Sequence, residues 1–521
     1  MLESQPVKRH LTRLTAIAIV LCTGSASFAV QSQIVASVRS YRQAHEVEIL
    51  KELLEFLAIP NVASDTPNIR RNADFIARLF KTRGVETRLL EVPNAPPVVY
   101  GEIKTPGASR TLIFYAHYDG QPVEPEKWKS GDPFKPVIYS NAFDDQETQP
   151  RVISFPPSSP QIDPEWRIYA RSASDDKAPI VAMLRALDAL RVGKIGLTSN
   201  IKFFFEGEEE AGSQHLESII SRYPDLLAAD AWIICDGPVD QNRNQQLYFG
   251  ARGVTGFELI VYGPRRELHS GHYGNWAPNP AMMLAQLLAS MKDADGKVLV
   301  EGFYDGVEPL TVTEKRAIAQ APSNDEMLKR ELGLARTEGK GEKLNQLITL
   351  PSLNVRGIQS ASTGATARNV IPASATASID IRLVKGVDHK VEVERVLTHI
   401  RKQGYEIIES EPDENARSKF PRLVRIRPQG GYNAARTSMD LAISQSIIKA
   451  VETIGRPVSK LPTLGGSVPL YIFTDILKTP AIGVPIVNHD NNQHSANENL
   501  RVKNLWDGIE VMATIMTMDR K

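Results

Sequence analysis

The chain is poor in cysteine, with only Cys22 and Cys235 among its 521 residues. Cys22 falls in an N-terminal segment that has the three parts of a secretory signal peptide. A basic stretch at 8–13 precedes an apolar run at 14–22 that is too short to span a bilayer, and residues 27–29 supply a small-x-small cleavage pattern. Cleavage there removes Cys22, so no intrachain disulfide can form and the protein relies on its core, on metal or on association.

The chain also lacks net charge, because 61 basic residues balance 61 acidic ones. A balanced chain offers neither the basic surface that nucleic acids require nor a polybasic membrane patch. From the N-terminal pattern described above, we expect residues 1–29 to be a signal peptide. We expect the mature protein to be exported, periplasmic or extracellular, and bound to neither nucleic acid nor membrane.

The order of predicted elements indicates two domains, since a single core stops growing near roughly 250–300 residues. Strands alternate with helices over 30–252, which predicts an α/β catalytic domain with a mixed, mostly parallel sheet. Over 253–431 the order is strand–helix–strand–strand–helix–strand, typical of a small two-layer α+β domain inserted into the first. Residues 432–521 resume the catalytic domain, with a helix at 437–454 and strands near 470 and at 482–487.

Two stretches of the catalytic domain stand out. Residues 121–165 have little periodicity and predict an unusually long loop with one or two short strands. Residues 203–213 read FFFEGEEEAGS, in which a buried strand runs straight into four carboxylates. A solvated acidic turn is one interpretation. The other is that cations stabilise the carboxylates at the end of a central strand, where ligands bind in α/β sheets.

Metal-binding side chains follow the predicted strands at five places: His117, Asp175, Glu210, Asp236 and, far downstream, His494. Imidazole and carboxylate form the ligand set for zinc or a similar divalent ion, with Co²⁺ and Mn²⁺ sharing the same ligands. We expect two Zn²⁺ ions, one bound by His117 and Asp236, the other by Glu210 and His494, with Asp175 bridging them. A water between two such ions is a nucleophile at neutral pH.

Two further side chains complete the expected chemistry. Asp119 follows His117 by two residues along an extended segment, so it can accept the imidazole N–H and fix the tautomer. Glu209 would be the general base that takes a proton from the bridging water and passes it to the leaving nitrogen.

In combination these motifs resemble the M20 family of dinuclear zinc peptidases and deacylases. The motifs are His117-Tyr118-Asp119, Ser174-Asp175-Asp176-Lys177, Glu208-Glu209-Glu210-Ala211-Gly212-Ser213, Asp236 and His494. Further matches favour the carnosinase-like dipeptidase branch: Leu268-His269-Ser270-Gly271, Pro351-Ser352-Leu353, Asn369-Val370-Ile371-Pro372, Asp380-Ile381-Arg382-Leu383-Val384 and Gly465-Gly466-Ser467-Val468-Pro469. The resemblance implies a zinc-binding domain with an inserted lid that forms a homodimer.

The resemblance also implies roles on the substrate side. His269 would cross the dimer to stabilise the oxyanion, while Arg382, Asn369, Gly466 and Ser467 would hold the substrate's C-terminal side. Asp236 is typical of members that cleave peptides with a free amine. We therefore expect hydrolysis of dipeptides or short peptides. An N-acyl amino-acid deacylase or carbamoylase is the alternative, and a metal-dependent binding protein is a third.

The sequence departs from the family pattern before the bridging aspartate. The usual Gly-Arg-Gly is Ala170-Arg171-Ser172 here, and the usual glycine after the lysine is Ala178. These changes alter local backbone freedom but remove no ligand. The family often has a cis peptide after the bridging aspartate, which is the 175–176 bond here.

Overall fold

A computed structural model describes residues 31–145, 148–157 and 161–520. The predicted signal peptide at 1–29 lies outside the described residues. The contacts divide the chain into two compact units. Unit 1 comprises residues up to Leu247, Ser438–Lys460 and Leu477 onward, and unit 2 comprises Tyr248–Thr437 and Leu461–Ile476. Unit 2 thus includes 248–252, 432–437 and 461–476, which the sequence predicts to belong to the catalytic domain.

Unit 1 is built on a sheet that has eight strands among the described residues, in the order β1-β2-β7-β3-β8-β20-β9-β19. Its strands are β1 (Glu86–Leu90), β2 (Val98–Ile103), β3 (Thr111–His117), β7 (Asn200–Glu206), β8 (Ala231–Ile234), β9 (Gln245–Tyr248), β19 (Val458–Leu461) and β20 (Ala481–Gly483). The central strands β7, β3, β8 and β20 are parallel neighbours. At the edge, β1 pairs antiparallel with β2 and β2 antiparallel with β7, so the sheet is mixed.

The aromatic run at 203–205 forms the buried middle of β7, as the sequence predicts. Phe204 lies on one face of the sheet, where its ring meets Trp232 at 5.3 Å. Phe203 and Phe205 lie on the opposite face against Phe80, with ring centroids 5.3 and 5.6 Å away. Because successive strand side chains point to opposite faces, one short run packs both layers of the core.

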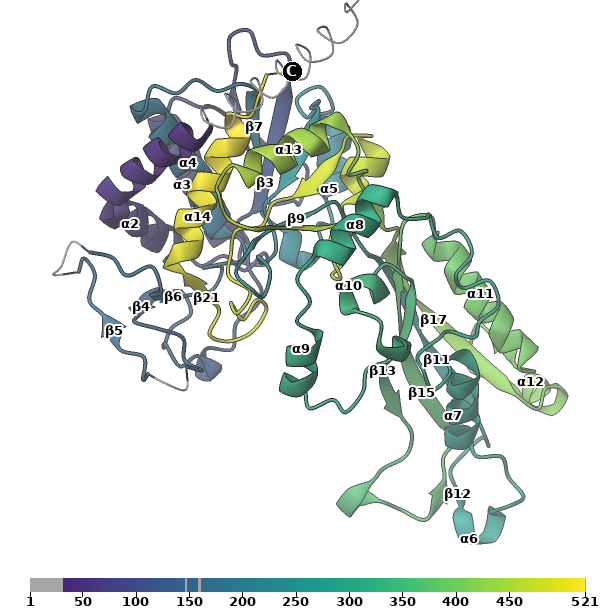
Figure 1. Ribbon diagram of the computed structural model, residues 1–521. Coiled ribbons are helices and arrows are strands. Elements are labelled where there is room, and N and C mark those ends of the chain that lie inside the picture. The colour runs from purple at the N-terminus through teal and green to yellow at the C-terminus, as the bar shows by residue number, and fades with distance from the viewer. Residues whose placement is uncertain (1–30, 146–147, 158–160, 521) are drawn as a thin grey trace, which may run out of the picture. The chain divides into compact units, whose positions relative to one another are not determined.

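Helices cover this sheet, and the long ones α4 and α14 pack against each other (Figure 1). The helices of unit 1 are α2 (Glu46–Leu57), α3 (Thr66–Thr82), α4 (Lys177–Val192), α5 (Leu216–Arg222), α13 (Ala442–Glu452) and α14 (Val502–Met516). Residues 31–44 are also helical. Helix α3 begins where the Asp65 side chain accepts the Asn68 N–H, a local cap that the sequence encodes directly.

A second, smaller sheet of unit 1 has four strands in the described part of the chain, ordered β21-β6-β4-β5. They are β4 (Val137–Tyr139), β5 (Val152–Ile153), β6 (Arg167–Tyr169) and β21 (Asn499–Arg501). β4 and β5 are the short strands expected within 121–165. β6 lies outside the main sheet and pairs with β21 and β4. Tyr169 of β6 packs on Phe143 from the long loop, with ring centroids 4.0 Å apart.

Unit 2 is a two-layer α+β domain, as predicted. Its sheet has five described strands, β13 (Ser352–Gln359), β15 (Ser374–Leu383), β11 (Gly253–Tyr262), β17 (Leu423–Tyr432) and β16 (Glu406–Ile408), in this spatial order. Helices α7 (Pro280–Met291) and α11 (His389–Lys402) share one apolar core with the sheet. The other elements are β10 (Gly250–Ala251), β12 (Leu268–His269), β14 (Val370–Ile371), β18 (Ala435–Arg436), α6 (Ser270–Tyr273), α8 (Val312–Gln320), α9 (Asp325–Glu331), α10 (Leu344–Leu347) and α12 (Glu414–Lys419).

Several sequence predictions of local structure were wrong. Residues near 470 form a π-helical turn, Ile472–Ile476, rather than a strand. The predicted strand at 482–487 ends at Gly483, and α13 is shorter than the predicted 437–454. The strands β9, β17 and β19 were not anticipated, because two of them are four residues long and β17 carries a proline and two glycines. No helix in the described ranges is both long and apolar enough to cross a membrane.

Candidate metal centre

Three neighbouring strands of the main sheet deliver candidate ligands to one edge. β7, β3 and β8 are adjacent and parallel, so their carboxyl ends lie together. His117 is the last residue of β3, Asp236 follows β8, and Glu209 and Glu210 follow β7 in a short 3₁₀ turn. The main sheet therefore gathers four of the predicted site residues by topology alone.

The other two ligands come from the small sheet. Asp175 follows β6 and His494 precedes β21, and these two strands pair antiparallel. The pairing brings together segments that are more than 300 residues apart in sequence. Asp175 is followed by a cis peptide bond to Asp176, which is the isomer that the family resemblance implies.

The candidate ligands form two groups among the described residues. One contains His117, Glu209 and Asp236, and the other contains Asp175, Glu210 and His494. Within each group the ligand atoms lie within 4.8 Å of one another. The structure thus brings together all five predicted metal ligands and the predicted base, and it places Glu209 and Glu210 in different groups although they are adjacent in sequence.

Asp175 reaches both groups. Its Oδ1 lies 2.9 Å from His117 Nε2, and its Oδ2 lies 3.1 Å from His494 Nε2. One carboxylate therefore faces two imidazoles that belong to different groups, which is the arrangement a bridging ligand requires. Glu210 Oε2 is also 3.2 Å from His494 Nε2, so each imidazole of the centre has a carboxylate beside it.

Asp119 lies beneath the centre and is fully buried. The His117 Nδ1 atom is 3.2 Å from the Asp119 main-chain oxygen and 3.4 Å from its Oδ1, so Asp119 can fix the imidazole tautomer as expected. The same carboxylate accepts the backbone N–H groups of Glu209 and Glu210, at 3.1 and 3.0 Å. This second contact was not anticipated, and it links the end of β3 to the turn after β7.

Burial and crowding perturb the titration of the centre. Burial and the neighbouring charge of Asp175 raise the pKa of Asp236 to about 6 and the pKa of Glu210 to about 8. Burial, with the charges of Asp236 and Glu210, also raises the pKa of Glu209. The hydrogen bond to Asp175 raises the pKa of His494 to about 9. Carboxylates in such a cluster need positive charge to stay ionised at neutral pH.

The donor set fits divalent cations. Each group offers an imidazole nitrogen and two carboxylates at a spacing that a zinc-sized ion can bridge. A cation at either position would stabilise the anionic forms that burial disfavours. The structure adds one residue that the sequence did not indicate. Gln121, at the start of the long loop, donates from Nε2 to Glu210 Oε2 at 2.8 Å. A lone glutamine gives no sequence signal of its own.

The sequence profile of peptidase family M20/M25/M40 matches residues 113–518, which include every ligand of this centre. The chain belongs to this family. The Cys-Gly metallodipeptidase DUG1 of Candida albicans is 28% identical over 489 residues, covering 89% of this chain and 93% of the relative. The Beta-Ala-His dipeptidase of Homo sapiens is 26% identical over 496 residues, covering 91% of each.

A solved M20 structure confirms the fold. The M20 family metallo-carboxypeptidase Sso-CP2 from Sulfolobus solfataricus superposes with a TM-score of 0.70 at 29% identity, covering 90% of this chain and 98% of that one. The predicted resemblance, including its dipeptidase branch, and the prediction of a metal-dependent peptidase are thereby confirmed. The individual roles of the site residues stay predictions.

The residues expected to hold substrate lie in unit 2 of this M20 chain. Arg382, on β15, donates from Nη1 to Ser467 Oγ at 2.7 Å and from Nε to Asp380 Oδ2 at 3.2 Å. The Gly466 carbonyl accepts the Arg252 N–H at 3.2 Å. Arg382, Gly466 and Ser467 therefore lie together, as a shared role in substrate binding would require.

His269 and Asn369 form a separate pair. His269 is exposed on β12, which pairs with β14, and the Ser270 N–H donates to the Asn369 carbonyl at 2.9 Å. The His269 Nδ1 accepts the Gly271 N–H at 3.0 Å, and the ring lies 4.4 Å from that of His272. No contact among the described residues joins this pair to Arg382.

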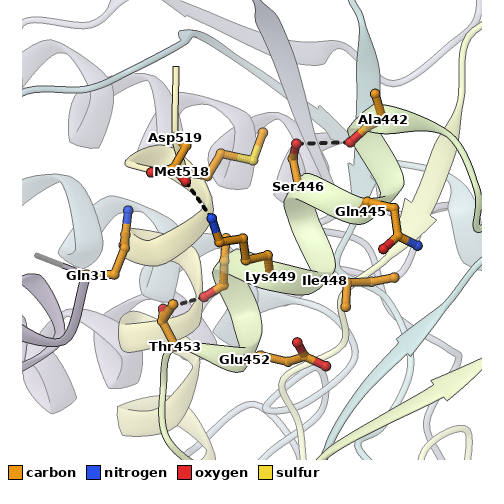
Figure 2. A pocket seen from close by; sticks show the side chains of 11 residues that line it. Gln31, Ala442, Gln445, Ser446, Ile448, Lys449, Glu452, Thr453, Met518 and Asp519 are labelled. Atoms are coloured by element: carbon orange, nitrogen blue, oxygen red, sulfur yellow. Dashed lines mark hydrogen bonds and ion pairs between the residues drawn. The ribbon is translucent and has the colours of Figure 1, made fainter. Parts of the chain in front are cut away.

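Unit 1 also has a surface hollow that shares no residue with the metal centre (Figure 2). Lys449 crosses it to form an ion pair with Asp519 at 2.9 Å. The hollow is lined by Gln31, Ala442, Gln445, Ser446, Ile448, Lys449, Ala450, Glu452, Thr453, Met518 and Asp519. These side chains include no imidazole or thiol, and we assign the hollow no part in the chemistry.

Proposed function

We propose that the chain is an exported, dinuclear metal-dependent hydrolase that cleaves dipeptides or short peptides with a free amino terminus. One observation carries the proposal: a single carboxylate, Asp175, faces the histidines of two adjacent ligand groups. Two divalent ions held there would polarise the scissile carbonyl and provide a nucleophilic water at neutral pH. Zinc suits the imidazole and carboxylate ligands, and Co²⁺ or Mn²⁺ could replace it.

Within this proposal the chain's own residues divide the work. Glu209 takes the proton from the attacking water and delivers it to the leaving nitrogen, since it is a carboxylate at the centre and burial raises its pKa above the ordinary value. Asp119 holds the His117 tautomer and the turn that carries Glu209. Arg382 presents a guanidinium fork suited to the substrate carboxylate.

A homodimer follows from placing His269 on the same substrate as Arg382. In the lid sheet Arg382 pairs with Val254 at one end of β11, and Ser374 pairs with Tyr262 at the other. Eight residues of strand separate Arg382 from Ser374, or about 26 Å at ~3.3 Å per residue. His269, on β12 paired with β14, lies beyond the Ser374 end. This distance from Arg382 within one chain supports the proposal that a second copy supplies His269.

The substrate class rests on the relatives and on Asp236. The two curated relatives are named as dipeptidases, and both span nearly the whole chain. The alternative, an N-acyl amino-acid deacylase or carbamoylase, has the same centre but acts on blocked amines. Export rests on the signal-peptide pattern, and secretion of a reporter fused to residues 1–29 would test it.

The decisive experiment compares free and N-acetylated dipeptides with the purified enzyme, before and after metal removal. We expect chelation to abolish hydrolysis, and Zn²⁺, Co²⁺ or Mn²⁺ to restore it on the free peptides. Turnover of the acetylated set only would refute the dipeptidase assignment.

The general base is tested by Glu209→Gln, which we expect to lower kcat about 10²–10⁴-fold. Glu208→Gln is the matched control, because Glu208 is the preceding carboxylate and binds His215 at 2.9 Å rather than the metal groups. A loss below tenfold in Glu209→Gln would remove the base assignment.

A further inference from the structure

The buried carboxylate of Glu498 is outside the ligand set but contacts the segment that carries Asp175. Glu498 is four residues after His494, and none of its surface is exposed. Its Oε1 accepts the Asp175 N–H at 2.9 Å, the Ser174 N–H at 3.0 Å and the Ser174 hydroxyl at 3.0 Å. Its Oε2 accepts the Ser172 N–H at 2.9 Å and Arg171 Nη1 at 2.8 Å.

Each of these partners is a donor, and together they occupy the lone-pair positions that two carboxylate oxygens offer. Arg171 supplies the compensating positive charge, with its own side chain nearly as buried as that of Glu498. The guanidinium is held in turn by stacking over the Trp128 ring, at 5.4 Å. A buried carboxylate with this set of donors is fixed in position, because losing any one of them leaves an unsatisfied polar group.

The contact connects two ligand loops. Asp175 donates its own N–H to Glu498, so the position of its main chain depends on that oxygen. His494 lies in the loop that ends at Glu498 and has a left-handed backbone, with φ of 59°. The other end of that loop is held by Asp490, which accepts from Arg167 at 2.6 Å and from Arg501 at 3.0 Å. Hydrogen bonds therefore hold both ends of the 490–498 loop, which allows the strained backbone conformation of His494 to persist.

We propose that Glu498 is a positioning residue that sets the spacing between Asp175 and His494 before a cation binds. Glu498 lies at the end of the His494 loop, and its carboxylate accepts the main-chain N–H of Asp175. This hydrogen bond maintains the 3.1 Å distance between His494 Nε2 and Asp175 Oδ2. The inference rests on the proposed function only in taking Asp175, Glu210 and His494 as a cation site.

The test is Glu498→Gln, which keeps the shape of the side chain but replaces one acceptor oxygen by an NH₂ group that faces donors. Removal of a partner behind a metal ligand typically costs 10–100-fold in metal affinity. We expect a loss of this size for one of the two cations, measured by titrating Zn²⁺ into metal-free protein by calorimetry. We also expect a changed visible spectrum of the Co²⁺-loaded protein.

The matched control is Glu510→Gln. Glu510 is also a buried carboxylate paired with an arginine, accepting from Arg39 at 2.9 and 2.8 Å, but it lies on α14, and its contacts within the described part of the chain include no ligand loop. We expect this variant to keep both metal affinities. Equal losses of affinity in the two variants would overturn the proposal, because the effect would then come from general destabilisation.

A milder variant guards against misfolding of Glu498→Gln. Ser174→Ala removes one donor and leaves the ion pair with Arg171 intact, and we expect a loss near tenfold, the lower end of the range. Wild-type affinity for both cations in Ser174→Ala overturns the proposal if Glu498→Gln cannot be purified. Because metal binding is the readout, failure of the proposed function would appear separately, as a wild-type enzyme that binds two cations and cleaves no dipeptide.

Discussion

Asp119→Asn tests the part of the centre where one carboxylate contacts two backbone N–H groups and an imidazole. The Asp119 carboxylate accepts two successive backbone N–H groups, from Glu209 and Glu210, and faces the His117 ring. Asparagine is nearly the same size, so the substitution leaves no cavity. It retains one acceptor oxygen and turns the other into a donor that faces an N–H group or the imidazole.

The expected cost follows from these contacts. A hydrogen bond to a charged group contributes about 1.5–3 kcal/mol, and a neutral one about 0.5–1.5 kcal/mol. Asp119→Asn loses one charged acceptor outright and weakens the other, which amounts to about 2–4 kcal/mol. The turn that carries Glu209 would also shift, and we expect kcat to fall 10–100-fold, as for other residues behind metal ligands.

Urea unfolding of the metal-free proteins measures the first effect, with an unchanged m-value as the criterion that only stability has moved. Steady-state kinetics on a dipeptide measures the second. Asp388→Asn is the control, since Asp388 also accepts two successive N–H groups, of Lys390 and Val391, but at the exposed start of α11. Asparagine caps helices nearly as well as aspartate, so we expect Asp388→Asn to change neither quantity appreciably.

Asp119 does not hold the turn and the imidazole if Asp119→Asn has an unfolding free energy within about 1 kcal/mol of the wild type and keeps kcat within about twofold, given the charged contacts it loses. That result would mean that the turn after β7 is held by its own hydrogen bonds. A large loss of kcat with unchanged stability would instead assign Asp119 to the imidazole alone.

Two further predictions lie outside the ligand set. Ser172 has a left-handed backbone with φ of 59°, and its Oγ accepts from Asn61 at 2.8 Å. Both Ser172→Gly and Ser172→Ala remove this hydroxyl, but only the glycine relieves the backbone strain. Urea unfolding should therefore show that Ser172→Gly is more stable than Ser172→Ala by about 1 kcal/mol. Burial, together with the charge of Lys402, lowers the pKa of His399. The unfolded protein therefore binds more protons at His399 than the folded protein does. The stability that His399 contributes is complete above about pH 6.5 and is lost as the pH falls through the folded pKa. The unfolding free energy of the wild type should therefore fall relative to that of His399→Gln between pH 7 and pH 5.

Much of the main sheet could be predicted because its signals are local. Uninterrupted apolar runs such as Thr111–Ala116 form central strands, and a polar group at the end of each run then lies at one known edge of a parallel sheet. His117, Glu209, Glu210 and Asp236 were found in this way. The predicted strand near 470 failed because a short apolar run does not distinguish a strand from a turn of helix.

The route by which Asp175 and His494 reach the centre could not be predicted. It depends on the pairing of β6 with β21, two strands of three residues each, separated by most of the chain. Short strands carry little periodicity, and long-range pairing has no signature in a single sequence. The sequence shows both residues as candidate ligands by their type and position, and the family motifs agree, while the small sheet that brings them together is visible only in the structure.

The acidic residues of the centre can be sorted by what their oxygens accept. Asp119, Glu208 and Glu498 all accept backbone N–H groups, so each holds a loop or turn in place. Asp119 and Glu208 also face an imidazole each, whereas Asp175 and Glu210 direct their oxygens at side-chain groups, namely the ligand imidazoles and the Gln121 amide. A carboxylate committed to main-chain donors has little capacity left for a cation, because its lone pairs point at N–H groups. The acidic residues after β7 therefore include both kinds of carboxylate, those that accept main-chain N–H groups and those available to a cation. Composition and spacing do not distinguish the two kinds, but the direction of each carboxylate relative to the main chain does distinguish them.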